Sequence, residues 1–256
     1  MNYLVKKLIL IKLGGSLITD KTKINVARHE VIENLVKQVK EIIENSKDLS
    51  LIIATGAGGF GHPVAKKYEN NLEEGLPFIK KAVKEINQIV VDSLNSEGIK
   101  SVSIEPSKIA EYENGKIVSL LDCSIVKLLE NNIVPVFHAD LVNDKKLGIS
   151  ILSMDRFMVD MAIDLKNSGH AVEKVIFCGT TDGVLDNNGK TIDKINRENY
   201  LKIKSYFYDN KEVDTSGGMK SKVEECLKLI DEKIPCVIIN GQKINELTGR
   251  TLIVQE

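Results

Sequence analysis

The chain has 256 residues, of which 43% are hydrophobic and 28% charged, and its formal net charge is −1. This length is enough for a substantial core and for one α/β domain with two lobes. The near-neutral balance argues against a strongly basic nucleic-acid surface and against a disordered tail. We therefore expect a folded protein with no nucleic-acid partner.

Neither a membrane span nor a secretion signal is visible in the sequence. The apolar run from Leu8 to Leu13 contains Lys12 and is much shorter than the roughly 20 residues that a membrane helix needs. No signal-peptide pattern is present. We expect a cytoplasmic protein without membrane insertion.

The four cysteines have no spacing that indicates a metal site or a disulfide framework. Cys123, Cys178, Cys226 and Cys236 form no Cys-x-x-Cys pair, and a chain of this size needs no disulfides to fold. We expect all four to be reduced thiols in the core.

Short apolar runs alternate with longer segments of helical periodicity along the chain, as is typical of a mainly parallel sheet. The runs expected to form strands are Leu8–Ile11, Leu51–Ala54, Ser101–Ile104, Ile133–Phe137, Lys174–Cys178 and Cys236–Ile239. Between them, the apolar residues of the segments 31–42 and 82–90 fall on one helical face. A further helix is expected from about Met154 to Asn167. The predicted class is α/β, with helices on both faces of the sheet.

Two glycine-rich turns follow the first two predicted strands, where open α/β sheets bind their ligands. The first runs from Lys12 through Gly14-Gly15-Ser16 toward Lys21, and the second covers residues 56–62. Without a side chain, glycine lets backbone N–H groups approach an anion closely, and helix N-termini add partial positive charge. One such turn could be only a tight turn, but two of them flanked by lysines favour an anion site.

A third glycine pair, Gly217-Gly218, precedes a predicted helix that carries Lys220 and Lys222 in its first turn. Lysines at this end of a helix oppose the helix dipole, and an anionic ligand would relieve that mismatch. An ordinary solvated helix start remains the alternative.

The second turn also contains G-x-G-x-x-G at Gly56, Gly58 and Gly61, which raises a dinucleotide-binding alternative. That fingerprint requires a second strand that ends in an acidic residue about 20 positions further on. The stretch from Pro63 to Asp92 is instead expected to be helix or loop. The P-loop pattern is absent as well.

Six segments then carry a resemblance to a known family: residues 11–21, 58–63, 134–140, 153–155, 181–183 and 217–220. Their order and spacing resemble the amino acid kinase superfamily over nearly the whole chain, and most closely the isopentenyl phosphate kinases of archaea. The resemblance implies an open αβα sandwich with a mainly parallel central sheet, in one domain that forms a homodimer. It places the acceptor in a lobe of about residues 1–165, MgATP in a lobe of about residues 166–256, and the reaction in isoprenoid biosynthesis by the mevalonate pathway.

The resemblance also assigns roles to individual residues. The predicted catalytic residues are Lys12, Lys21, His62 and Asp155. The predicted acceptor-binding residues are Ala57, Gly58, Gly61, His62 and Asp140. The predicted residues for ATP are Lys12, Gly14, Gly15, Ser16, Asp182, Gly183, Gly217, Gly218 and Lys220. No side chain is predicted to ligate a metal, so Mg²⁺ would arrive with ATP.

The chemistry of phosphoryl transfer suits these residue types, because it depends on positioning and on neutralising charge. Lys12 is expected to bridge the β- and γ-phosphates, Lys21 to steady the transferring group, and His62 to donate to the acceptor phosphate. Asp155, buried between the two lysines, would keep all three charged. The alternatives are a structural His62 and an Asp155 that only caps a helix.

Five positions depart from the pattern of isopentenyl phosphate kinases, and they leave rival functions open. Thr55 and Ala57 stand where His and Gly are usual, and the other three positions are Ala139, Arg156 and Thr180. Ser153-x-Asp155-Arg156 is similar to fosfomycin kinase, and an arginine there could bind a further anionic oxygen. The rivals are therefore a kinase of a phosphonate or another phosphorylated small molecule, and a non-catalytic nucleotide-binding regulator. An apolar lining from the segment 78–90 would favour a prenyl chain.

Overall fold

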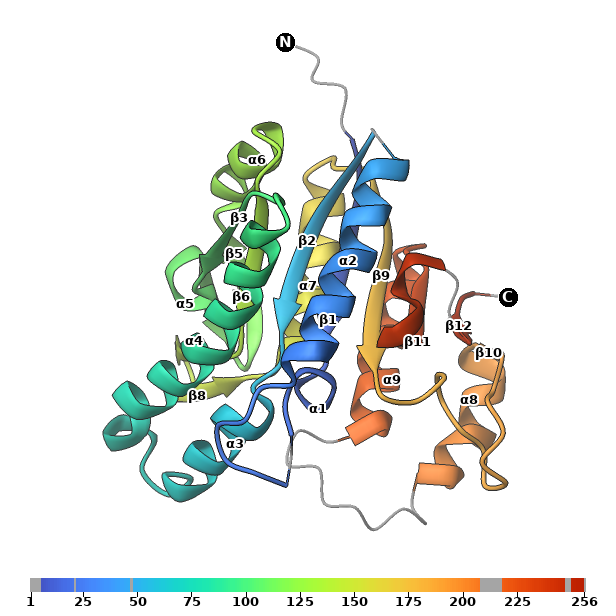
Figure 1. Cartoon of the computed structure of the whole chain (residues 1–256). Helices are drawn as coiled ribbons and strands as arrows, with labels where there is room; N and C mark the ends of the chain where they lie inside the picture. Colours follow the sequence, from blue (N-terminus) through green and yellow to red (C-terminus); the bar gives the residue numbers. More distant parts are fainter. Residues whose placement is uncertain (1–5, 21, 47, 208–217, 247–249, 256) are drawn as a thin grey trace.

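The computed structural model describes residues 6–20, 22–46, 48–207, 218–246 and 250–255. Its centre is an eight-stranded sheet in the order β10-β12-β11-β9-β1-β2-β6-β3 (Figure 1). The strands are β1 (Lys7–Leu13), β2 (Leu49–Thr55), β3 (Ser101–Ile104), β6 (Val134–His138), β9 (Val172–Gly179), β10 (Lys194–Ile195), β11 (Cys236–Asn240) and β12 (Thr251–Ile253). All described neighbours pair in parallel except β11 and β12. Each of the six predicted runs overlaps one of these strands.

Helices cover both faces of the sheet, which confirms the predicted αβα sandwich. Helices α2 (His29–Asn45) and α4 (Leu72–Ser96) pack on one face, where Ile9 and Ile11 of β1 join their core. Helices α7 (Met154–Asn167) and α9 (Gly218–Asp231) pack on the other face, against Leu8 and Leu10. Consecutive residues of a strand point to opposite faces. A strand buried on both faces is therefore apolar throughout, which is why these runs were recognisable.

A small second sheet, which the sequence did not predict, projects beside β6. Its order is β5-β4-β7-β8. The strands are β4 (Ala110–Glu113), β5 (Lys116–Leu120), β7 (Asp140–Asp144) and β8 (Gly148–Leu152). The pairs β4–β5 and β7–β8 are antiparallel hairpins, and residues 145–147 form the turn between β7 and β8.

The remaining elements are short and connect the two sheets with the helices. They are α1 (Gly15–Ile18), α3 (Gly58–Lys67), α5 (Pro106–Ile109), α6 (Asp122–Glu130), α8 (Arg197–Ile203), and the 3₁₀ helices η1 (Lys204–Phe207) and η2 (Gly241–Glu246). Because α3 and α4 occupy most of the segment between Gly58 and Ser96, no second strand follows the glycine turn. The dinucleotide-binding alternative is therefore wrong.

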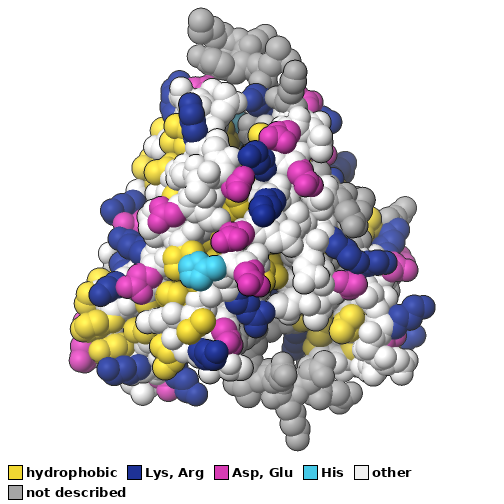
Figure 2. Space-filling model, in the orientation of Figure 1, with side chains coloured by type: hydrophobic (Ala, Val, Ile, Leu, Met, Phe, Trp, Pro, Cys, Tyr) yellow, Lys and Arg dark blue, Asp and Glu magenta, His cyan; other side chains and the backbone are white. Residues whose placement is uncertain are grey.

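Three of the four cysteines follow the prediction. Cys178, Cys226 and Cys236 are buried, whereas Cys123 at the start of α6 is exposed, and none of the four forms a disulfide. The face in Figure 2 mixes lysines and arginines with acidic side chains, as the net charge suggests. Over the described ranges, every helix is too short or too polar to cross a membrane.

Candidate active site

A cleft of about 770 Å³ opens beyond the carboxyl ends of β1, β2, β6 and β9. Both glycine turns that follow β1 and β2 line it, and so do α3, α4, β8, α7 and α9. The topology therefore brings together segments from residue 12 to residue 222. This is the position at which open α/β sheets bind ligands.

Asp155 lies between two lysines on the floor of the cleft. Its carboxylate oxygens are 2.8 Å from Nζ of Lys12 and 2.7 Å from Nζ of Lys222. The three side chains are only 11%, 13% and 16% exposed, in the order Lys12, Asp155, Lys222. Lys12 is the penultimate residue of β1, Asp155 is in the first turn of α7 and Lys222 is near the start of α9, so three distant segments meet in one ion-paired group. We call these three residues the charged triad.

Burial and pairing oppose each other in the charged triad. Burial alone would raise the pKa of Asp155, but the two lysines outweigh it and hold that pKa well below its usual range. Burial lowers the pKa of Lys12, and Asp155 only partly offsets this. For Lys222, burial also acts to lower the pKa, but the attraction of the Asp155 carboxylate outweighs burial and raises the pKa. The ammonium of Lys222 additionally lies 5.0 Å from the ring centroid of Phe177, within cation–π range.

The sequence missed Lys222. The third glycine turn did indicate a cationic helix start, but the resemblance assigned Lys220, which is not among the described residues that line the cleft. Residues two apart on a helix point in different directions, and apolar periodicity does not tell which lysine faces a ligand. The predicted contact between Asp155 and Lys12 is confirmed. Lys21, the other predicted partner, lies outside the described residues, as does Gly217.

Asp155 is not the cap of α7. Ser153 occupies that position, and its side chain accepts from the N–H of Arg156 at 3.5 Å. The helix-cap alternative for Asp155 is therefore wrong, and its carboxylate serves the two lysines.

The two glycine turns pack directly against each other. A Cβ on Gly15 would lie 2.4 Å from the nitrogen of Gly58, and one on Gly56 would lie 2.6 Å from the nitrogen of Gly15. Gly58 also has φ of +50°, in the left-handed region. Side chains at these positions would force the turns apart.

Only some of the predicted backbone donors are available to a ligand. The N–H of Gly14 donates to the carbonyl of Cys178 at 2.9 Å, and that of Gly61 to Ala57 at 3.0 Å. Within the described part of the chain, the N–H groups of Gly15, Ser16 and Gly58 have no protein acceptor. Gly14 and Gly61 therefore shape the turns, whereas Gly15 and Ser16 line the cleft and keep donors for an anion. Gly58 is not among the described residues that line the cleft.

His62 and Ala57 also line the cleft, as predicted. His62 lies in the first half of α3 and is followed by Pro63. The methyl group of Ala57 lies 2.7 Å from the point where a Cβ on Gly61 would stand, so it packs over that glycine. Ala57 adopts right-handed helical angles, so its replacement of a glycine brings no backbone strain.

Part of the cleft lining is apolar. Its side chains come from α3, α4, β8 and the start of α7, and they are Ala65, Ile79, Val83, Ile151, Leu152 and Met154. Ile79 and Val83 belong to the segment of α4 for which an apolar lining was the criterion for a prenyl chain. Phosphate-binding groups and hydrocarbon therefore face one cavity.

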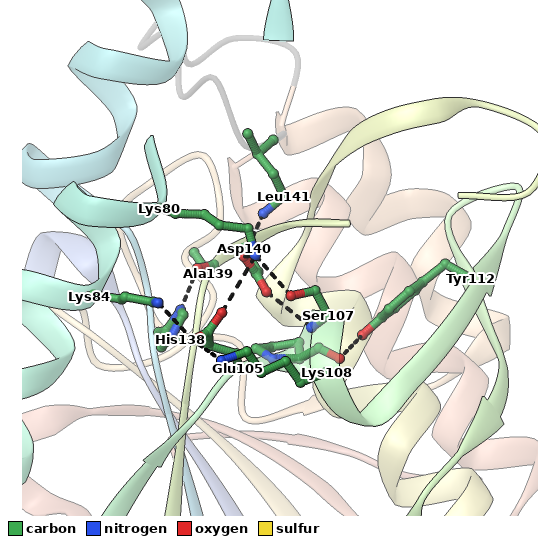
Figure 3. Close-up of polar contacts among 11 residues, drawn as sticks. Lys80, Lys84, Glu105, Ser107, Lys108, Tyr112, His138, Ala139, Asp140 and Leu141 are labelled. Carbon is green, nitrogen blue, oxygen red and sulfur yellow. Dashed lines mark hydrogen bonds and ion pairs between the residues drawn. The ribbon is translucent and has the colours of Figure 1, made fainter. Parts of the chain in front are cut away.

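Asp140 borders the cleft, but its carboxylate is engaged within the protein (Figure 3). It lies 2.8 Å from Nζ of Lys80 and accepts from the N–H groups of Ser107 and Leu141. Its side chain is fully buried. Lys80 also lies 3.6 Å from Glu105, so these contacts join α4 to the small sheet.

Asp182 and Gly183 do not face the cleft among the described residues, although the preceding Thr180 and Thr181 do. Asn240 donates to Asp182 at 2.9 Å. Gly183 has φ of +103° and packs against Thr251. These contacts fix the loop after β9. Gly218, at the start of α9, does line the cleft.

Arg156 points away from the cleft. Its guanidinium lies 2.7 Å from where a Cβ on Gly115 would stand, in the turn between β4 and β5, and Arg156 is absent from the described cleft lining. The expectation that this arginine could bind an anionic oxygen of the acceptor is therefore wrong. The carboxylate of Asp160 lies one helical turn further along α7. Burial raises the pKa of Asp160, and the positive charge of the nearby Arg156 only partly offsets this.

The described residues contain no group of three His, Cys, Asp or Glu side chains that could hold a metal ion. Asp155, the acidic residue of the charged triad, is already paired with two lysines.

Comparison with known proteins agrees with this geometry. The fold and the cleft define an α/β protein with an anion site at the ends of parallel strands, and the model of the Amino acid kinase family matches residues 7–240. The chain belongs to this family. Within it, the chain is 34% identical to isopentenyl phosphate kinase of Methanocaldococcus jannaschii, over 94% of this chain and 93% of the relative.

A second isopentenyl phosphate kinase, from Methanothermobacter thermautotrophicus, is 32% identical over 91% of each chain. A solved isopentenyl phosphate kinase structure is 27% identical with a TM-score of 0.76, and the match covers 96% of this chain and 99% of that one. The resemblance inferred from the motifs is confirmed.

Proposed function

We propose that this protein is an ATP-dependent kinase that transfers the γ-phosphoryl group of ATP to isopentenyl phosphate, giving isopentenyl diphosphate and ADP. The observation that carries the proposal is one cleft in which the charged triad, backbone donors and apolar side chains face the same cavity. The similarity to two isopentenyl phosphate kinases at more than 30% identity supports it.

The nucleotide phosphates are assigned to the triad side of the cleft. Lys12 and Lys222 offer two ammonium groups to the β- and γ-phosphates, and Asp155 holds both in position. The N–H groups of Gly15 and Ser16 add donors that need no reorganisation during transfer. Lys21 remains a proposed participant in phosphoryl transfer. Gly217 and Gly218 remain proposed nucleotide-binding residues.

The acceptor phosphate is assigned to the second glycine turn. The N–H of Gly58 and the imidazole of His62 are its proposed donors, with Ala57 and Gly61 shaping the turn. The isopentenyl tail would lie against Ile79 and Val83, since burial of each methylene contributes about 0.8 kcal/mol. Asp140 acts in this proposal by holding the small sheet, not by direct contact with the acceptor.

In the proposed reaction an oxygen of the acceptor phosphate forms a bond to the γ-phosphorus, and the bond from that phosphorus to the β–γ bridging oxygen breaks. The electron pair leaves with ADP. An acceptor phosphate oxygen is already anionic, so no strong base is required. The protein contributes position and charge neutralisation, in line with how kinases generally act.

Several finer features belong to the same proposal. Mg²⁺ would enter with ATP and neutralise phosphate charge, because the described side chains offer no metal cluster of their own. Asp182, Gly183 and Lys220 would support the loops around the nucleotide. A homodimer in the cytoplasm, acting in isoprenoid biosynthesis by the mevalonate pathway, is the setting that the family resemblance suggests.

The test is ADP release by the purified protein with MgATP and, in parallel, isopentenyl phosphate, dimethylallyl phosphate and fosfomycin. Turnover with the prenyl phosphates at least ten times faster than with fosfomycin is the expected result. Turnover with fosfomycin alone would reject the substrate. Nucleotide binding without turnover on any acceptor would support the non-catalytic regulator instead.

A further inference from the structure

Thr19 joins the two glycine turns through a single buried hydroxyl group. It ends α1, directly after the first turn, and it is fully buried. Its Oγ1 donates to the carbonyl of Gly15 at 2.7 Å and accepts from the N–H of Gly59 at 2.8 Å. Gly15 belongs to the turn assigned to ATP, and Gly59 to the turn assigned to the acceptor.

The contact is close and specific. A Cβ on Gly58 would lie 2.3 Å from Oγ1 of Thr19, so the threonine packs on the bare backbone of the second turn. The N–H of Gly59 is in the first turn of α3, where helices leave donors unpaired. The hydroxyl of Thr19 accepts from this N–H group, whereas the N–H of Gly58 has no protein acceptor among the described residues.

Few other polar contacts fix the turns to each other. The N–H of Gly56 donates to Leu13 at 2.9 Å as the last rung between β1 and β2, and that of Asn25 donates to Gly59 at 3.2 Å. Beyond the strand ends, the side chain of Thr19 forms hydrogen bonds with both turns. It is not among the described residues lining the cleft, so it acts without touching either substrate.

We propose that Thr19 is a positioning residue that sets the distance between the nucleotide phosphates and the acceptor phosphate. This inference rests on the proposed function, because the two turns are assigned to the two substrates there. Transfer requires the reacting atoms to be near 3–3.5 Å apart, and a misplacement of about 1 Å can cost roughly 100-fold in rate. Loss of the hydroxyl bridge should therefore reduce kcat more than it weakens either substrate.

The test compares Thr19→Val, which keeps the branched shape but removes both hydrogen bonds, with Thr19→Ser, which keeps them. Tyr112→Phe is the matched control. Its hydroxyl is also buried and donates to the carbonyl of Pro106 at 3.2 Å, and Tyr112 belongs to β4 of the small sheet, outside both glycine turns. The readouts are kcat, KM for ATP, KM for the acceptor, and Tm.

We expect Thr19→Val to lower kcat by about 10- to 100-fold with each KM changed by less than about 3-fold, and Thr19→Ser to stay within about 3-fold of wild type. Tyr112→Phe should lower Tm but leave kcat and the acceptor KM near wild type. If Thr19→Val does not fold, Thr19→Cys replaces it, because a thiol of similar size is a much weaker hydrogen-bonding group.

The outcomes separate the two proposals. Wild-type kcat in Thr19→Val, or equal kcat losses in Thr19→Val and Tyr112→Phe, overturns the positioning role and leaves the function intact. Wild-type turnover with fosfomycin alone rejects isopentenyl phosphate as substrate, and the ratio of Thr19→Val to wild type on fosfomycin still decides the role of Thr19.

Discussion

Replacement of Asp155 by asparagine should destabilise the protein in a way that ATP reverses. The change leaves Lys12 and Lys222 without their counter-charge, in a site where all three side chains are less than about 20% exposed. At an effective dielectric constant of about 20, each contact near 2.8 Å corresponds to roughly 6 kcal/mol of gross attraction. After desolvation is included, removal of one member of a buried pair costs about 3–5 kcal/mol.

For a chain of this size, that loss lowers Tm by about 6–20 °C, which differential scanning fluorimetry measures directly. Bound ATP supplies negative charge to the same two lysines. Saturating ATP should therefore raise Tm more in Asp155→Asn than in wild type, while ADP release falls by about 100-fold or more because the lysines are no longer held in place.

Asp164→Asn is the matched control on the same helix. Burial raises the pKa of Asp164, helped by Asp122, so removal of its charge should not lower Tm by more than about 1 °C. An apo Tm for Asp155→Asn equal to that of wild type, or an equal ATP-induced shift in both proteins, would refute the reasoning about the charged triad.

Three further predictions concern single side chains. His62→Ala should lower kcat/KM for the acceptor by about 100- to 1,000-fold and leave KM for ATP within about 3-fold; an equal effect on both substrates in steady-state kinetics would make His62 structural. Arg156→Met should leave the acceptor KM unchanged within about 3-fold, because the guanidinium faces Gly115, and a large rise would restore the anion-binding role. For Glu105, burial acts to raise the pKa, but Lys84 and Lys108 outweigh it and lower it to about 2. The stability that Glu105 contributes is therefore present above its unfolded pKa near 4.3 and lost as pH falls toward 2. Glu105→Gln should cost about 1–2 kcal/mol at pH 7, after allowance for water around the lysines, and the difference from wild type in urea titrations should vanish near pH 2.

The central sheet was predictable because its strands are buried on both faces, so that Leu8–Ile11 and Lys174–Cys178 appear as apolar runs. The small sheet was not, because strands such as β5 (Lys116–Leu120) are short and largely exposed. Their residues show neither an apolar run nor a clean alternation. Such strands are fixed by tertiary contacts, such as the four backbone N–H groups that Asp144 accepts from two hairpin turns.

The candidate site was predictable where a motif places its own residues, and less so where two distant segments meet. The glycine turns place Gly15, Ser16 and His62 in the cleft directly. The choice of Lys222 over Lys220 depends on how α9 is rotated against β1, and the pairing of Asp140 with Lys80 depends on how α4 meets the small sheet. Both are set by packing between elements, which local periodicity does not encode.

The distribution of charge in the cleft favours one arrangement of the two substrates. The charged triad carries a net charge of +1 and includes two ammonium groups, whereas the second glycine turn offers neutral N–H donors and one imidazole. Two unit negative charges 4 Å apart repel by about 4 kcal/mol at an effective dielectric constant of 20. Under the proposed function, we therefore expect the more highly charged substrate, ATP, to bind at the triad and the phosphomonoester to bind at the second turn. Because Asp155 pairs with both lysines in the folded protein, their charge is already in place when the phosphoryl group moves. The conformational entropy of the two lysine side chains is therefore lost during folding and not during the reaction.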